Sequence, residues 1–200
     1  MTDRLEGIQH IAIIRGVTPD RAVQVTEAFF EAGFRAIEVP LNSPEPLVSI
    51  GKMVDAFGDQ MLVGAGTVLS PEAVDQVADT GAQLLVSPNT NSAVIGRAKE
   101  RGMVSLPGVL TPSECFNALD AGADALKVFP ASSIGFSGVN MLTHVMPPGT
   151  KLFAVGGVSA GNVQQWMDAG CAGVAAARNC FTPEMSIDEI RDAASAFVRA

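Results

Sequence analysis

Residues 111–130, TPSECFNALDAGADALKVFP, contain one complete helix–strand unit. Thr111-Pro112 pairs an N-cap hydroxyl with proline at the first helical position, which is typical of a helix start. Gly122 supplies the left-handed residue with which many helices end. The run Ala125–Phe129 is short and apolar, as expected of a buried strand. The stretch therefore predicts a helix over 112–121 that leads directly into a strand.

The same residues that start and end helices recur along the chain. Similar helix starts are Thr18-Pro19, Ser43-Pro44 and Ser70-Pro71, and similar helix ends are Gly33, Gly81, Gly102 and Gly170. Strands are predicted at Ile8–Ile14, Ala36–Leu41, Met61–Gly64, Gln83–Val86, Met103–Leu106, Ala125–Phe129, Leu152–Val155 and Gly173–Ala176. Helices are predicted at 19–32, 44–57, 71–80, 91–101, 112–121, 137–146, 159–169 and 186–199.

Eight strand–helix units predict the α/β class. Continuously apolar strands are typical of a parallel sheet covered by helices on its outer face. We expect a closed (β/α)8 TIM barrel that forms a single domain over residues 1–200, and an open doubly wound sheet is the alternative.

The composition of the chain argues against several classes of protein, among them nucleic-acid-binding and membrane-spanning proteins. Hydrophobic residues make up 48% of the chain and charged residues 17%, with a net charge of −8. Without a Lys/Arg cluster, nucleic acid is not an expected partner, and no apolar run approaches membrane-spanning length. Three cysteines without paired spacing indicate free thiols, and we expect a cytoplasmic protein. His10 and His144 are far apart in the sequence and are read as structural, so no metal site is predicted.

Two charged residues interrupt apolar strands. Lys127 lies within Ala125–Phe129, and Glu38 lies within Ala36–Leu41. Burial lowers the pKa of an amine and raises that of a carboxyl, which suits them to imine formation and to proton transfer. The alternatives are a lysine that extends to solvent, and a glutamate that pairs structurally with Lys127 or Arg15.

Other polar groups follow the predicted strands at the same rim. Arg15 could bind a carboxylate or a phosphate through two parallel hydrogen bonds, and a surface cation in a loop is the alternative. Thr67 follows a glycine turn whose backbone amides could position an anion. Gly156-Gly157 precedes a helix start, where bare amides bind phosphate, and a simple tight turn is the other reading.

Several motifs together resemble one known family, the class I aldolases of the 2-keto-3-deoxy-6-phosphogluconate and 2-keto-3-deoxy-6-phosphogalactonate type. The similarity runs from about Ile11 to Val198. The segments that carry it are Ile14-Arg15-Gly16-Val17-Thr18, residues 36–44 (AIEVPLNSP), Gly64-Ala65-Gly66-Thr67-Val68-Leu69, Val86-Ser87-Pro88-Asn89, Leu106-Pro107-Gly108, Ala125–Pro130 and Phe153–Val158.

This resemblance implies a homotrimeric barrel that releases pyruvate without a metal or organic cofactor. It implies that Lys127 forms the imine and that Glu38 is the general acid and base. Thr67 would contact the pyruvyl carboxylate, and Arg15 would hold the substrate. The other substrate-binding residues expected are Pro88, Phe129, Val155, Gly156, Gly157 and Arg178.

The substrate expected is a sugar-acid phosphate. Residues 38–42 (EVPLN) and Val155 are closer to the phosphogalactonate branch than to the phosphogluconate branch. The family's Gly-Ser pair after the last strand is replaced by Ala177-Arg178, so that charge could take the place of a hydroxyl. Phosphogluconate or unphosphorylated 2-keto-3-deoxy acids are alternative substrates, and a non-catalytic sugar-acid-binding or scaffold barrel is the alternative from another class.

Overall fold

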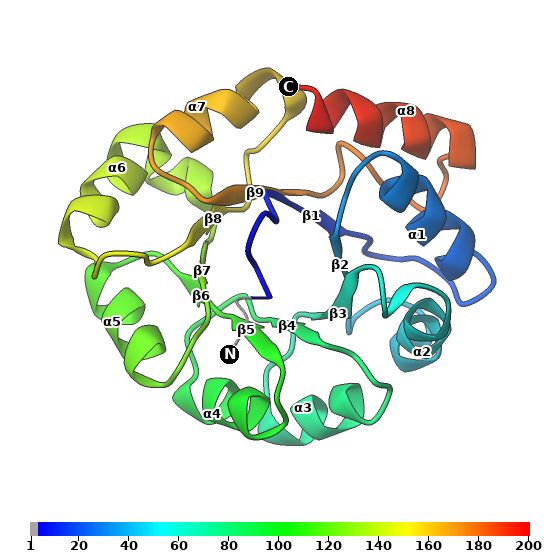
Figure 1. The fold of residues 1–200 in the computed structure, drawn as a ribbon, viewed down its shortest axis with the longest axis horizontal. Coiled ribbons are helices and arrows are strands. Elements are labelled where there is room, and N and C mark those ends of the chain that lie inside the picture. Colours follow the sequence, from blue (N-terminus) through cyan, green and yellow to red (C-terminus); the bar gives the residue numbers. More distant parts are fainter. Residues whose placement is uncertain (1–3) are drawn as a thin grey trace.

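The computed structural model describes residues 4–200 and shows strands that alternate with helices around a barrel (Figure 1). The strands are β1 (His10–Ile13), β2 (Ala36–Pro40), β3 (Leu62–Gly66), β4 (Leu84–Val86), β5 (Val104–Leu106), β6 (Gly108–Val109), β7 (Leu126–Val128), β8 (Leu152–Ala154) and β9 (Gly173–Ala176). The helices are α1 (Ala22–Glu31), α2 (Pro46–Phe57), α3 (Pro71–Ala78), α4 (Ser92–Glu100), α5 (Pro112–Asp120), α6 (Gly135–Val145), α7 (Val163–Asp168) and α8 (Ile187–Val198).

All the strand pairs are parallel, in the order β5-β4-β3-β2-β1-β9-β8-β7-β6. The fifth predicted strand, Met103–Leu106, corresponds to β5, and the short strand β6 that follows it was not predicted. Pro107 separates the two strands, because proline lacks the N–H that a continuous ladder requires. The carbonyl oxygen of Pro107 still accepts a hydrogen bond from the Lys127 amide at 2.9 Å. The sheet therefore closes across Pro107, and the open-sheet alternative is wrong.

The predicted helix ends are confirmed, whereas two of the four starts predicted from a Ser/Thr-Pro pair are not. Positive φ angles occur at each exit glycine: Gly33, Gly81, Gly102, Gly122 and Gly170. Ser70 and Thr111 cap α3 and α5 through their hydroxyls. Helix α2 instead begins at Pro46, because the Ser43 hydroxyl already accepts from the Gly16 amide at 3.0 Å. Before α1, the carbonyl of Thr18 rather than its hydroxyl accepts from Arg21 and Ala22, and the helix begins at Ala22.

Two apolar clusters result from the inward and outward alternation of strand residues. The inner cluster fills the barrel and includes Ile11, Leu84, Val104 and the fully buried Phe153, with Leu5 packed against them. The outer cluster lies between strands and helices. His10 contacts the rings of Phe34 and Phe197, which fits the predicted structural role.

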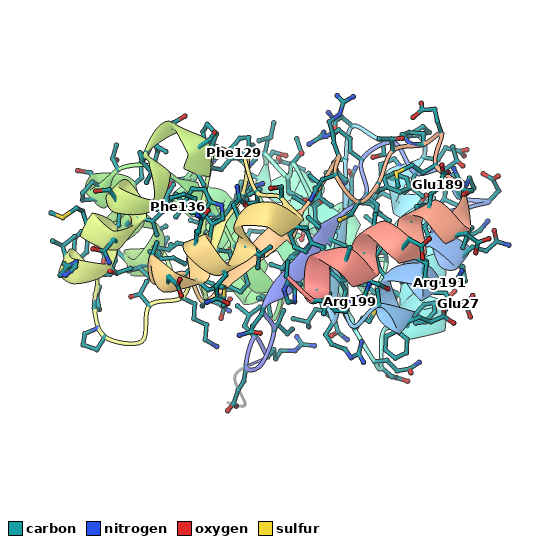
Figure 2. The ribbon with its side chains drawn as sticks, turned by 90° about the horizontal axis from the view of Figure 1, so that it is seen from above. Glu27, Phe129, Phe136, Glu189, Arg191 and Arg199 are labelled. Carbon is teal, nitrogen blue, oxygen red and sulfur yellow. The ribbon has the colours of Figure 1, made fainter. Side chains whose placement is uncertain are left out.

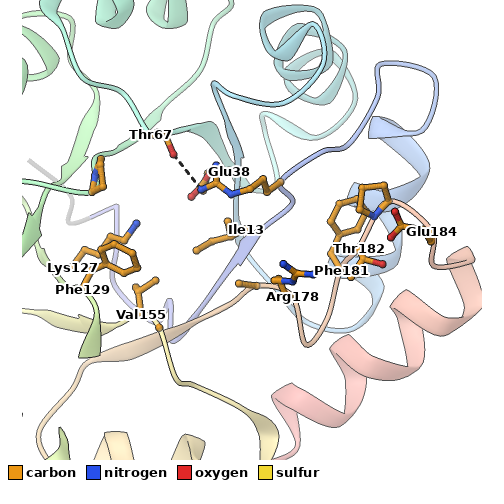
Figure 3. A pocket seen from close by; sticks show the side chains of 15 residues that line it. Ile13, Glu38, Thr67, Lys127, Phe129, Val155, Arg178, Phe181, Thr182 and Glu184 are labelled. Carbon is orange, nitrogen blue, oxygen red and sulfur yellow. Dashed lines mark hydrogen bonds between the residues drawn. The ribbon is translucent and has the colours of Figure 1, made fainter. Parts of the chain in front are cut away.

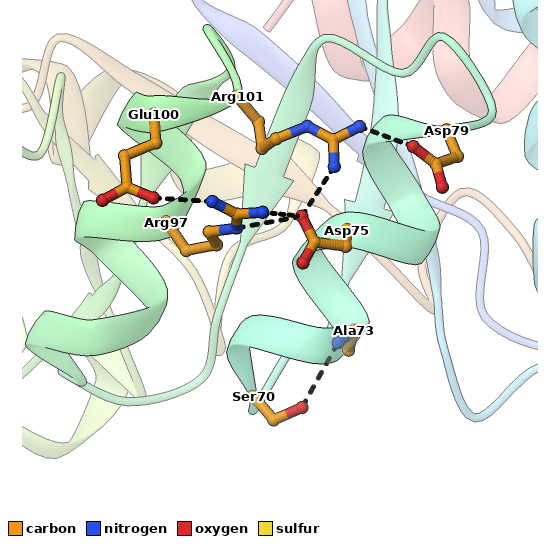
Figure 4. A network of polar contacts seen from close by, with 7 residues as sticks. All are labelled: Ser70, Ala73, Asp75, Asp79, Arg97, Glu100 and Arg101. Atoms are coloured by element: carbon orange, nitrogen blue, oxygen red, sulfur yellow. Dashed lines mark hydrogen bonds and ion pairs between the residues drawn. The ribbon is translucent and has the colours of Figure 1, made fainter.

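An ion-pair network connects α3 with α4 (Figure 4). Asp75 accepts from Arg97 at 2.8 Å and from Arg101 at 2.6 Å, and Arg101 also contacts Asp79. These hydrogen bonds, led by the one from Arg97, lower the pKa of Asp75. All four groups are substantially exposed, so we expect each pair to contribute little stability by itself, and the network to fix how the two helices pack.

Candidate active site

A cavity of about 450 Å³ opens at the carboxyl ends of the strands (Figure 3). Barrel active sites lie at this rim. Of the residues predicted from sequence, the lining includes Arg15, Glu38, Thr67, Pro88, Lys127, Phe129, Val155, Gly156 and Arg178. Gly157 is not among the lining residues, and a Cβ there would lie 2.6 Å from that of Ser132. The structure thus gathers the predicted residues in one place, and their roles stay predictions.

Glu38 points into the barrel from β2, where it pairs with Ile13 of β1 and Gly64 of β3. Only 1% of it is exposed, and its Oε2 atom has no hydrogen-bond partner within the described part of the chain. Burial raises the pKa of Glu38 from its ordinary 4.5 to about 7, against the smaller opposing effects of Lys127 and Arg15. A carboxyl with this pKa can both take and return a proton near neutral pH.

Gly66 provides the space that the Glu38 carboxylate occupies. A Cβ at position 66 would lie 2.0 Å from Oε2 and 2.3 Å from Oε1 of Glu38. Because this carboxylate is enclosed, a methyl group at Gly66 must displace either the carboxylate or the strand.

We expect Gly66→Ala to destabilise the fold by about 1–3 kcal/mol, the usual cost of overpacking. The displaced carboxylate should also lower turnover by more than tenfold, on the scale of a general acid–base contribution. Thermal unfolding and steady-state kinetics measure the two effects. Gly96→Ala is the matched control, since nothing lies within 4 Å of a Cβ at that helical position. Normal turnover in the Gly66 variant would show that the position of the Glu38 carboxylate does not matter.

Lys127 enters the cavity from β7, where it pairs with Gly108 of β6 and Phe153 of β8. Its exposure is only 7%, so it does not extend into solvent as the alternative reading proposed. Burial lowers its pKa, Glu38 opposes this and Arg15 adds to it. The amine nitrogen lies 4.8 Å from the centroid of the Phe129 ring. A lysine in this setting loses its proton more readily than one in water, and a neutral amine is a nucleophile.

Arg15, Asn42 and Thr67 form a polar group beside Glu38. The Arg15 guanidinium donates to the side-chain oxygen of Asn42 and, at 3.4 Å, to the hydroxyl of Thr67. Thr67 has a φ of 58°, a left-handed conformation that is uncommon outside glycine and often occurs at functional sites. A fixed cation next to a hydroxyl is suited to binding a carboxylate.

A second polar group lies at the other side of the cavity from Lys127 and comprises Arg178, Thr182 and Glu184 (Figure 3). The pKa of Glu184 is lowered chiefly by a hydrogen bond from the Thr182 hydroxyl, with a further contribution from the charge of Arg178. Arg178 was predicted from the sequence, whereas four further residues that line the cavity were not: Phe181, Thr182, Pro183 and Glu184. Their position in the connection that follows the last strand was the available signal, because such connections lie at the rim.

Comparison with protein families matches residues 1–192 to the KDPG and KHG aldolases. The chain belongs to this family. It is 49% identical over 190 residues to a 2-dehydro-3-deoxy-6-phosphogalactonate aldolase of Escherichia coli (strain K12), covering 95% of this chain and 93% of the relative. It is 44% identical to a probable enzyme of the same name from Rhizobium meliloti (strain 1021), covering 95% and 90%. A solved structure of native KDPGal superposes with a TM-score of 0.95 and 48% identity, covering 96% and 94%.

Membership of the KDPG and KHG aldolase family confirms the resemblance seen in the sequence and makes the chain an aldolase, that is, a lyase. Among residues 4–200, no three His, Cys, Asp or Glu side chains are grouped so that they could hold a metal ion. In the same range, no helix combines the length and apolar character needed to cross a membrane.

Proposed function

We propose that this chain is a class I aldolase that cleaves 2-dehydro-3-deoxy-6-phosphogalactonate to pyruvate and glyceraldehyde 3-phosphate, and that residues 1–200 act as one domain. The observation that carries the proposal is the pair formed by Lys127 and Glu38. Both are buried in one cavity, and both pKa values are displaced toward the neutral form. The names of the two curated relatives support the choice of substrate.

The reaction begins when the neutral Lys127 amine attacks the C2 carbonyl of the substrate. Glu38 moves the protons that convert the carbinolamine to an iminium ion with loss of water. The Glu38 carboxylate then takes the proton of the C4 hydroxyl, the C3–C4 bond breaks, and its electron pair enters the iminium system to give an enamine. Glyceraldehyde 3-phosphate leaves. The enamine takes a proton at C3, and water hydrolyses the resulting imine to pyruvate and free Lys127.

The two polar groups of the cavity suit the two ends of this substrate. Arg15 and Thr67 lie beside Glu38 and would bind the C1 carboxylate next to the reacting carbon. Arg178 lies on the other side, where it would bind the phosphate together with the backbone at Gly156. Binding at both ends holds C2 near Lys127. The binding energy of the two charged ends is thus used to align the substrate carbonyl with the amine.

A coupled assay of pyruvate release tests the proposed function. The enzyme is supplied with the two C4-epimeric phosphorylated acids and with their unphosphorylated analogues, and we expect the galacto epimer to have the highest kcat/KM. Glu184 and Ala177 at the distal end favour one second candidate, an aldolase of unphosphorylated acids, because a carboxylate repels phosphate. A higher kcat/KM for the unphosphorylated galacto acid would select that candidate. If none of the substrates yields pyruvate, the non-catalytic barrel is the remaining alternative.

We expect Arg178→Ala to raise the KM for the phosphorylated substrate about ten- to a hundredfold, since charge-assisted hydrogen bonds contribute roughly 1.5–3 kcal/mol. Trapping of pyruvate on Lys127 should not change, because pyruvate has no distal phosphate. Steady-state kinetics and borohydride trapping measure the two. Arg199→Ala is the control, since this exposed arginine follows α8 outside the cavity lining. An unchanged KM in the Arg178 variant would remove this residue from the phosphate site.

We also infer a homotrimer. Large apolar side chains remain exposed on α5 and α6: Phe116, Phe136, Met141 and Val145. Figure 2 shows Phe136 on the flank of the molecule and Phe129 at the edge above it. Exposed apolar groups of this size support contact with a second copy. Sedimentation or light scattering should give three times the mass of the chain, and a monomer would contradict the inference.

A further inference from the structure

The distal wall of the cavity is a connection without regular structure between β9 and α8. It contributes Arg178, Phe181, Thr182, Pro183 and Glu184 to the lining. Within the connection, the amides of Cys180 and Phe181 donate to the carbonyl of Ala177, and the Met185 amide donates to the carbonyl of Thr182 at 3.2 Å. These bonds shape the segment locally, but they do not fix its position relative to Glu38 and Lys127.

Arg21, just before α1, lies far from this connection in the sequence but contacts it directly. Its guanidinium donates to the carbonyl oxygen of Pro183 and, at 2.6 Å, to that of Met185. The ring of Pro183 also packs against Gly16, where a Cβ would lie 2.8 Å from Pro183 Cγ. The distal wall is therefore attached to the same segment that carries Arg15.

We propose that Arg21 is a positioning residue for substrate binding, an inference that rests on the proposed function. It holds residues 182–185 so that Arg178 and Thr182 face the distal end of the substrate. Arg21 itself is outside the cavity lining. A planar guanidinium can satisfy two carbonyl oxygens at once, whereas an ammonium group presents a single nitrogen centre. Cys180 and Phe181 are buried in the outer cluster and hold the first part of the connection. Without Arg21, the carbonyls of Pro183 and Met185 lose their partner, and residues 182–185 are free to move away from the substrate.

Amide hydrogen exchange tests the attachment without any substrate. In Arg21→Ala, the amides of Thr182 and Met185 should exchange more than tenfold faster than in the wild type, and those of Phe181 and of β2 should not change. Arg35→Ala is the matched control, because Arg35 also donates to two backbone carbonyls, of Phe30 at 3.0 Å and Phe34 at 2.7 Å, away from this segment. Unchanged exchange at 182–185 in the Arg21 variant would overturn the proposal.

Kinetics test the consequence for the substrate. Arg21→Ala should raise the KM for the phosphorylated acid about tenfold, equivalent to roughly 1.4 kcal/mol. It should leave kcat within twofold and pyruvate trapping unchanged, and Arg21→Lys should restore part of the KM. A merely structural role predicts a lower melting temperature with unchanged KM, as expected of Arg35→Ala, and that result overturns the proposal. If the wild type releases no pyruvate at all, the proposed function fails, and the exchange experiment alone decides whether Arg21 holds the wall.

Discussion

Lys127→Arg should reduce pyruvate release to less than about one part in 10⁴ of the wild-type rate, as expected when an essential nucleophile is removed. The guanidinium stays protonated at every accessible pH and cannot form the imine. Lys127 is buried in the cavity, and burial lowers its pKa. The neutral amine that the chemistry requires is thus favoured by the fold, and no other described lysine is buried in this way.

Mass spectrometry after borohydride treatment with pyruvate identifies the reacting lysine directly. We expect one pyruvyl group on Lys127 and loss of activity in the trapped enzyme. Lys52→Arg is the matched control, because Lys52 is exposed and donates to the carbonyl of Pro19, and it should trap and turn over as the wild type does. Labelling of Lys52, Lys99 or Lys151 in the wild type would show that another lysine forms the imine.

The barrel was predictable because its signals are local and repeated. A glycine that ends a helix needs only a left-handed φ, and each predicted exit has one. Hydroxyl caps were less certain, because a serine side chain can be taken by another partner, as Ser43 is by the Gly16 amide. The fifth predicted strand ended at Leu106, and β6 was missed because a two-residue strand after a proline is too short to show an apolar pattern.

The candidate site was predictable where topology alone positions a residue. In a parallel barrel, polar residues at strand ends must meet at one rim, so Glu38 and Lys127 come together although 89 positions separate them. The wall formed by Phe181–Glu184 was missed, because an irregular connection has no hydrophobic periodicity from which its path could be predicted. It also receives hydrogen bonds from Arg21, more than 160 residues earlier, and no local sequence pattern encodes this contact.

The second large effect is expected from Glu38→Gln, which should lower turnover on the order of 10²–10⁴-fold while the fold is kept. A carboxamide fills the same space beside Gly66 but can neither accept nor return the proton. Trapping of pyruvate on Lys127 should persist, more slowly, because the amine remains. Glu27→Gln on the exposed face of α1 is the control and should behave as the wild type. Near-normal turnover in Glu38→Gln would exclude Glu38 as the proton-transfer group.

The pH dependence gives an independent test of the same residue. Retro-aldol cleavage needs ionised Glu38, so wild-type turnover should rise with pH through an apparent pKa of about 7, and Glu38→Gln should lose this limb. Stability should change in the opposite direction. Because the folded-state pKa lies above the unfolded value near 4.5, folding binds a proton between these pH values, and the contribution of Glu38 to stability is present below pH 4.5 and is lost as pH rises through about 7. The melting temperature of Glu38→Gln relative to the wild type should therefore increase across this window. A difference that is independent of pH would mean that the folded protein does not raise the pKa of Glu38, and the role of this carboxyl as a proton carrier near neutral pH would lose its physical basis.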